Sequence, residues 1–150
     1  NAKLLINAGA DMVKIEGENN ILEIVKHLSI NEILVCGHIG CMPQVNKIKN
    51  LANEDLLTKA KNLQEAGLKM LVMSMTSELD DKIITNQLSI PTISFRSSPF
   101  CNGEVEVLYD LLGITSAFFS NNKKDTDQIG LSTMLDNLEK FIKKIHMRKN

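Results

Sequence analysis

The chain has 150 residues, a formal net charge of −1 at pH 7, 43% hydrophobic residues and no tryptophan. That length is enough for one domain with a sizeable core, and the near-neutral charge argues against a nucleic-acid or anionic-membrane partner. No 18-residue apolar span and no charged-then-apolar leader is visible, so we expect a soluble, cytoplasmic protein with no membrane partner. Three isolated cysteines without a Cys-x-x-Cys pair predict reduced thiols and not a disulfide framework or zinc site.

The spacing of apolar residues predicts helices alternating with strands along the whole chain. Helices are expected at 1–8, 21–28, about 54–65, from 77 onward and at about 131–147, and strands at 12–17, 33–35, 70–73, 90–95 and 104–108. This alternation predicts a parallel sheet with right-handed crossovers. The strands could form an open doubly wound sheet or a piece of an eight-stranded barrel, and periodicity alone does not choose.

The helix after residue 76 carries the clearest local signals. Ser77 is predicted to be its N-cap, with Asp80 three residues further on. Ile83, Ile84 and Leu88 are expected to face the core.

Two stretches combine apolar residues with groups that can do chemistry. Lys14 and Glu16 are two residues apart in a predicted strand and therefore share one face, which indicates that this face meets water or a ligand. Gly37 and Gly40 flank His38 directly after a predicted buried strand, which predicts a loop that allows close backbone approach. The alternative is an ordinary turn with a hydrogen-bonded histidine. Ligands of α/β proteins collect where parallel strands end.

These two stretches together resemble the ketopantoate hydroxymethyltransferase (3-methyl-2-oxobutanoate hydroxymethyltransferase) family. The matching segments are Val13–Gly17 (VKIEG), Cys36–Gly40 (CGHIG) with Pro43-Gln44, Glu65–Gly67 (EAG), Leu88–Ile93 (LSIPTI) and Asn102–Ile114. The resemblance covers residues 1 to about 116. It implies an α/β fold, an incomplete (β/α)8 or TIM-like barrel of about five parallel strands with flanking helices. The expected organisation is a single α/β domain over 1–150, with the partial barrel at 1–116, a linker at about 117–130 and a C-terminal helix at about 131–147.

The resemblance also implies an activity. The family transfers a hydroxymethyl group from 5,10-methylenetetrahydrofolate to α-ketoisovalerate in pantothenate biosynthesis, with Mg²⁺ or another divalent metal. Matched position by position, Lys14 and His38 would bind the substrate and Glu16 would lie at the metal. Such a metal polarises the keto acid, and a carboxylate base then removes a proton from the adjacent carbon.

Several departures predict that this activity is impaired. Ser74 stands where the family's catalytic glutamate is expected, so no catalytic residue is assigned. The chain begins one helix before the Val-Lys-Ile-Glu-Gly strand, whereas the family's earlier strands carry further metal and substrate ligands. Ser94–Ser98 replaces a glycine-rich segment, and Arg96 within it is expected to be solvated or salt-bridged more than anion-binding.

Three interpretations of the sequence therefore remain open. The first is a truncated family enzyme. The second is a non-catalytic relic or accessory binding subunit, and the third is a half-enzyme that uses a separately encoded N-terminal half. Exposed sheet edges template pairing with other chains, so a homo-oligomer that covers the open sheet is expected.

Overall fold

The computed structural model describes residues 1–17, 21–40, 56–95, 98–114 and 130–147. These residues belong to two compact units, Asn1–Val105 and Glu106–Asn150. The first unit contains α1 (Ala2–Asn7), β1 (Val13–Lys14), α2 (Ile21–Ile30), β2 (Val35–Gly40), α3 (Leu56–Glu65), β3 (Met70–Ser74), α4 (Glu78–Gln87), β4 (Thr92–Phe95) and β5 (Gly103–Val105). The second contains α5 (Leu108–Leu111) and α8 (Leu131–Met147), which pack against each other.

The strands of the first unit form one sheet in the order β1-β2-β3-β4-β5, and every neighbouring pair is parallel. A doubly wound sheet reverses its strand order at a switch point, whereas a barrel adds each strand beside the previous one. The sequential order therefore confirms the predicted barrel-type α/β fold with about five parallel strands and flanking helices. The sheet is open, and β1 and β5 are its edge strands among the described residues.

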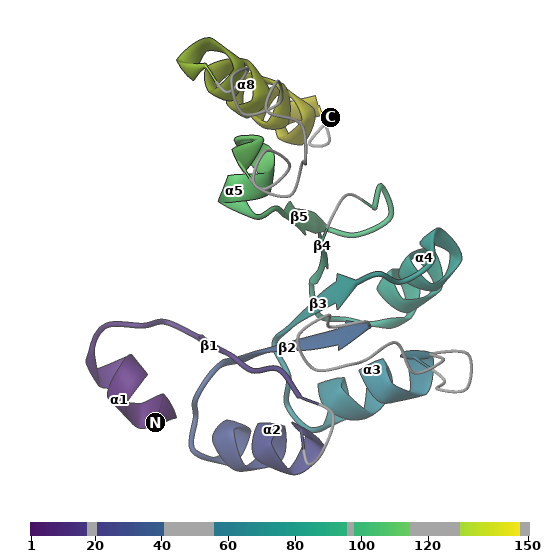
Figure 1. The fold of residues 1–150 in the computed structure, drawn as a ribbon. Helices are drawn as coiled ribbons and strands as arrows, with labels where there is room; N and C mark the ends of the chain where they lie inside the picture. Colours follow the sequence, from purple (N-terminus) through teal and green to yellow (C-terminus); the bar gives the residue numbers. More distant parts are fainter. Residues whose placement is uncertain (18–20, 41–55, 96–97, 115–129, 148–150) are drawn as a thin grey trace. The chain divides into compact units, whose positions relative to one another are not determined.

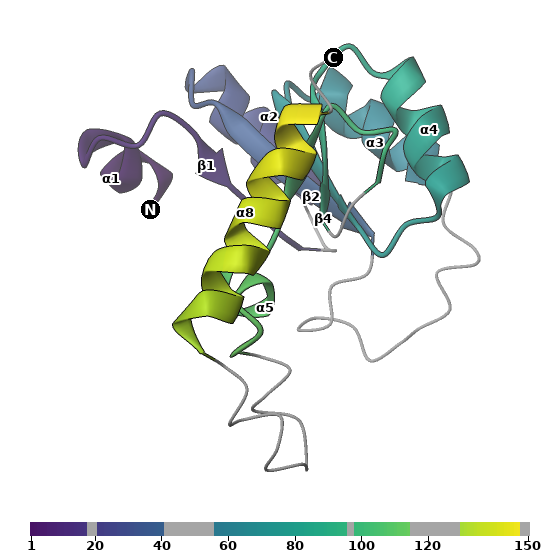
Figure 2. The ribbon, with the colours of Figure 1, turned by 90° about the horizontal axis from the view of Figure 1, so that it is seen from above.

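The helices of the first unit that follow β1 pack on one face of this sheet. The helices α2, α3 and α4 are consecutive neighbours, with α3 packed against both of the others (Figures 1 and 2). Side chains from both layers share one core cluster, including Val13, Val35, Ile39, Leu71 and Met73 from the strands and Val25, Leu63 and Ile84 from the helices. Since side chains alternate along a strand, the residues between these strand positions face the opposite side of the sheet.

The predicted N-cap and core-facing residues of α4 are confirmed, with one exception. The Ser77 side chain caps α4 by accepting a hydrogen bond from the backbone N–H of Asp80 at 3.1 Å. Ile84 and Leu88 are buried as expected. The prediction that Ile83 faces inward is wrong, because it is 37% exposed. Successive helical residues point about 100° apart, and Ile84 occupies the core-facing direction.

The prediction of a loop around His38 is also wrong. The strand β2 continues from Val35 to Gly40, and Gly37 and His38 pair with Leu71 and Val72 in the middle of the sheet. A Cβ added to Gly37 would lie 2.9 Å from the Leu68 Cδ1 atom. Glycine is therefore used here for close packing within a strand, and not for a turn.

The C-terminal boundaries also differ slightly from expectation. The strand predicted at 104–108 is shorter, β5 ends at Val105, and α5 begins at Leu108. The helix α8 spans Leu131–Met147, the range expected from its apolar spacing. No helix among the described residues has the length and apolar character needed to cross a bilayer.

Candidate functional site

Four polar side chains meet on the sheet face opposite to the one on which α2, α3 and α4 pack. Lys14 ends β1, Glu16 follows it, His38 lies in β2, and Ser74 is the last residue of β3. The register pairs Lys14 with Cys36 and Gly40 with Ser74, so all four lie toward the carboxyl ends of adjacent parallel strands. This is the end of a parallel sheet at which α/β proteins place their ligands.

The four side chains form a continuous hydrogen-bonded chain. The Lys14 ammonium donates to Glu16 Oε1. The same carboxylate oxygen lies 3.1 Å from His38 Nδ1, and His38 Nε2 lies 2.7 Å from Ser74 Oγ. The interactions therefore link three strands through one imidazole ring.

The chain of contacts runs from the surface into the protein. The side chains of Lys14 and Glu16 are 45% and 38% exposed, whereas the residues His38 and Ser74 are 9% and 3% exposed. The two charged side chains therefore lie at the accessible end, where they remain in contact with water and the desolvation penalty is small. The neutral hydroxyl lies at the buried end. A small anionic ligand that approaches from solvent would meet the Lys14 ammonium first.

The pKa of the Glu16 carboxyl is lowered from its ordinary value of 4.5. The hydrogen bond from Lys14 is the largest cause and the hydrogen bond from His38 the second, while partial burial opposes them. Glu16 is therefore ionised at neutral pH, and its Oε1 atom accepts hydrogen bonds from both Lys14 and His38.

This lowered pKa predicts a pH-dependent contribution of Glu16 to stability. A carboxyl with a depressed folded-state pKa stabilises the fold above its unfolded pKa, and this contribution is lost as pH falls through the folded pKa. Glu16→Gln should cost roughly 0.2–1 kcal/mol of unfolding free energy at pH 7, because solvent screens a partly exposed pair. Urea titrations should show this cost shrinking as pH falls below the ordinary glutamate pKa of 4.5 and disappearing once pH passes below the lowered folded-state pKa, while the exposed control Glu65→Gln shows no such trend. A cost that stays the same from pH 7 into the acid range would contradict the prediction.

Gly40 holds the end of β2 against the end of β3. Its φ is +98°, a backbone conformation that disfavours a side chain, and an added Cβ would overlap the carbonyl oxygen of Ser74. The predicted close backbone approach is therefore made by Gly40, and it fixes the backbone of Ser74.

The structure brings together all four residues that the sequence singled out for this site. Sequence reasoning treated Ser74 only as the loss of a glutamate and missed its hydrogen bond to His38. The signal was available in the strand alternation, since His38 and Ser74 both fall on the face opposite the core residues of their strands. Pro43, Gln44 and Arg96 lie outside the described residues.

A neighbouring thiol does not extend the site chemically. Cys36 is buried, and burial raises the pKa of its thiol, although nearby Lys14 opposes this effect. The protonated thiol is a poor nucleophile, as expected from its position in a strand.

The donor set fits a divalent metal only in part. Among the described residues, no three histidine, cysteine or acidic side chains come together as a metal-binding group. Glu16 supplies one carboxylate, and its Oε1 atom is already shared by Lys14 and His38. Mg²⁺ is commonly held by one or two carboxylates, with water and substrate completing an octahedron. Glu16 can therefore be one ligand of such an ion, but the described residues do not provide a complete set.

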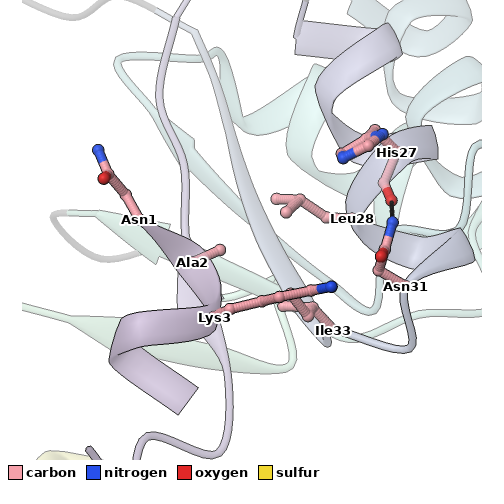
Figure 3. A pocket seen from close by; sticks show the side chains of 7 residues that line it. All are labelled: Asn1, Ala2, Lys3, His27, Leu28, Asn31 and Ile33. Atoms are coloured by element: carbon pink, nitrogen blue, oxygen red, sulfur yellow. Dashed lines mark hydrogen bonds between the residues drawn. The ribbon is translucent and has the colours of Figure 1, made fainter. Parts of the chain in front are cut away.

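A separate pocket of about 390 Å³ lies between α1 and the end of α2 (Figure 3). Its lining consists of Asn1, Ala2, Lys3, His27, Leu28, Asn31 and Ile33. Asn31 uses its amide to donate to the His27 carbonyl at 2.8 Å, an interaction within α2 and the turn that follows. None of the four site residues lines this pocket, so it is not part of the candidate site.

Comparison with protein families gives a match over nearly the whole chain. The family described as ketopantoate hydroxymethyltransferase matches residues 1–149. Curated relatives named 3-methyl-2-oxobutanoate hydroxymethyltransferase include one from Buchnera aphidicola subsp. Schizaphis graminum, 44% identical over 77% of this chain and 47% of its own length. Another, from Nitrosomonas europaea, is 43% identical over 86% of this chain and 53% of its own length. The chain spans about half the length of the curated relatives it matches.

Comparison with solved structures supports the fold alone. The YdjI aldolase from Escherichia coli K12 superposes with a TM-score of 0.51 over 90% of this chain and 59% of its own. The sequence identity is 13%, so this likeness carries no information about chemistry.

Proposed function

The chain belongs to the ketopantoate hydroxymethyltransferase family, and from that premise we propose that its Lys14–Ser74 site binds the keto acid acceptor of hydroxymethyl transfer. The acceptor would be α-ketoisovalerate and the donor 5,10-methylenetetrahydrofolate, in a cytoplasmic pathway to pantothenate. The observation that carries this proposal is the joining of Lys14, Glu16 and His38 at the carboxyl ends of adjacent strands.

Each residue has a distinct part in this proposal. The Lys14 ammonium is the most exposed cation of the site and would pair with the substrate carboxylate as a point charge. His38, oriented by Glu16 through Nδ1, would hydrogen-bond a substrate oxygen through Nε2 in exchange for its contact with Ser74. A divalent metal with Glu16 as one ligand would supply Lewis-acid polarisation of the keto group.

Ser74 makes the proposed transfer slow. A general base contributes roughly 10²–10⁴ to the rate of such a reaction, and a serine hydroxyl is neutral at neutral pH. This feature favours a second candidate function, an accessory subunit that binds the keto acid without turning it over.

Calorimetry with α-ketoisovalerate and Mg²⁺ tests the binding that both candidates share. Lys14→Met should weaken binding roughly 10- to 100-fold, because a charge-assisted hydrogen bond contributes about 1.5–3 kcal/mol. Lys26→Met, on the exposed side of α2, is the matched control and should bind as the unmodified chain does. Absence of binding by the unmodified chain, or equal loss in both variants, would overturn the proposal.

We further propose that the open sheet is completed by another chain. The partner would be a second copy or a separately encoded N-terminal half, because β1 and β5 are the edge strands of the sheet among the described residues, and sheet edges can pair with another chain. Light scattering should then give a mass above that of one chain. A monomer that persists at high concentration and in the presence of an N-terminal half would contradict it.

A further inference from the structure

We propose that Ser74, His38 and Glu16 form a serine nucleophile site that attacks small activated carboxylic esters. Ser74 Oγ lies 2.7 Å from His38 Nε2, and His38 Nδ1 lies 3.1 Å from Glu16 Oε1. This is the connectivity of a nucleophile, a base and an orienting acid, which is recognised by geometry and not by sequence order. The activity would be distinct from hydroxymethyl transfer and does not depend on keto acid binding.

The contacts of Glu16 give the direction of these hydrogen bonds. The Lys14 ammonium can only donate, and it shares Glu16 Oε1 with His38, so this oxygen is an acceptor and His38 Nδ1 carries the proton that faces it. In the neutral imidazole, Nε2 is then the acceptor, and the Ser74 hydroxyl donates to it. The ring is therefore held in the tautomer that can take a proton from serine.

The backbone around Ser74 supports the same role. Ser74 ends β3, Met75 follows with a positive φ of +53°, and α4 begins at Glu78. In α/β-hydrolases the nucleophilic serine also lies between a strand and a helix, where it occupies the strained turn itself, whereas here the strained residue is the adjacent Met75. Non-glycine residues with positive φ are uncommon and are enriched at functional sites. The Ser74 carbonyl lies so close to Gly40 that a side chain at position 40 would overlap it, so the backbone of Ser74 is tightly packed against the end of β2.

The reaction that this geometry allows has two balanced steps. Ser74 Oγ forms a bond to the ester carbonyl carbon while its proton passes to His38 Nε2. The bond to the leaving alkoxide then breaks, and the alkoxide takes that proton and departs as the alcohol. Water attacks the acyl-serine by the same route, which releases the acid and restores the hydroxyl. The low exposure of Ser74 and His38 restricts the substrate to small esters.

Diisopropyl fluorophosphate, followed by peptide mass mapping, tests the nucleophile directly. We expect modification of Ser74, with fluoride leaving and the serine proton passing to His38. His38→Gln should slow the modification roughly 10²- to 10⁴-fold, and Glu16→Gln at least about tenfold, because the tautomer is no longer fixed. Ser89→Ala, a serine hydrogen-bonded to Gln64 outside this site, should leave the rate unchanged. Hydrolysis of p-nitrophenyl acetate, with a burst that disappears in Ser74→Ala, provides the second readout.

Two results would overturn the inference. One is modification of Ser74 no faster than that of Ser89, and the other is a rate that Glu16→Gln leaves unchanged while thermal melting shows an intact fold. Calorimetry with α-ketoisovalerate on the same preparation separates the two proposals. Binding without modification of Ser74 would overturn only the nucleophile site, and modification without binding would overturn only the proposed function.

Discussion

Ser74→Glu should accelerate exchange of the C3 proton of α-ketoisovalerate with deuterated water by roughly 10²–10⁴-fold, because it supplies a general base. Ser74 is the last residue of β3, beside His38 and at the position where the family resemblance places a glutamate. Proton exchange reports the base alone, since it needs no folate. NMR in the presence of Mg²⁺ measures it as loss of the C3 proton signal.

Ser74→Gln is the size-matched control for this experiment. Glutamine adds the same bulk at a position that is 3% exposed, but it cannot accept the proton. We expect Ser74→Gln to exchange no faster than the unmodified chain. Equal exchange rates in the glutamate and glutamine variants, both with cooperative melting, would show that Ser74 does not occupy the position of the missing base.

Gly40→Ala should destabilise the first unit by about 2–5 kcal/mol. The alanine would have to adopt a φ of +98°, and its Cβ would overlap the Ser74 carbonyl oxygen. Backbone strain of this kind costs about 1–3 kcal/mol, and overpacking a close contact costs about as much again. Since the carbonyl oxygen belongs to the backbone and the backbone fixes the position of the Cβ, neither atom can move without disturbing the pairing of β2 with β3. Urea denaturation followed by circular dichroism measures the change.

Gly37→Ala provides the comparison in the same strand. Its added Cβ would meet the Leu68 Cδ1 atom at 2.9 Å, but Leu68 can rotate its side chain, and the backbone at Gly37 has no positive φ. We expect a cost of about 1 kcal/mol. If the two substitutions cost the same, the approach of Gly40 to Ser74 does not define the end of the sheet.

Much of the fold could be predicted because its signals are local. Apolar spacing located most of the described strands and helices, although it missed α5 and most of β2, and the cap at Ser77 formed as its sequence required. The least accurate interpretation was the loop around His38. Glycine next to histidine is typical of turns, but in β2 the glycine at position 37 accommodates Leu68 from a different segment. No local pattern reports such a contact.

In the candidate site, too, local patterns predicted some features and contacts between distant segments determined the others. Lys14, Glu16 and His38 were identified from their motifs, and strand alternation placed Lys14 and Glu16 on one face. The hydrogen bond between His38 and Ser74 joins residues 36 positions apart and depends on the parallel register of β2 with β3. That register is a property of the assembled sheet.

The sequence by itself determined the family, the alternation of strands and helices, and the residues able to carry charge or donate hydrogen bonds. All of these depend only on residue types and their spacing along the chain. Tertiary structure alone decided the sequential strand order, the strand character of the His38 segment and the linking of Ser74 through His38 to Glu16. The physical reason is that these features depend on backbone pairing and side-chain contact between segments far apart in the chain, which exist only once the sheet has formed.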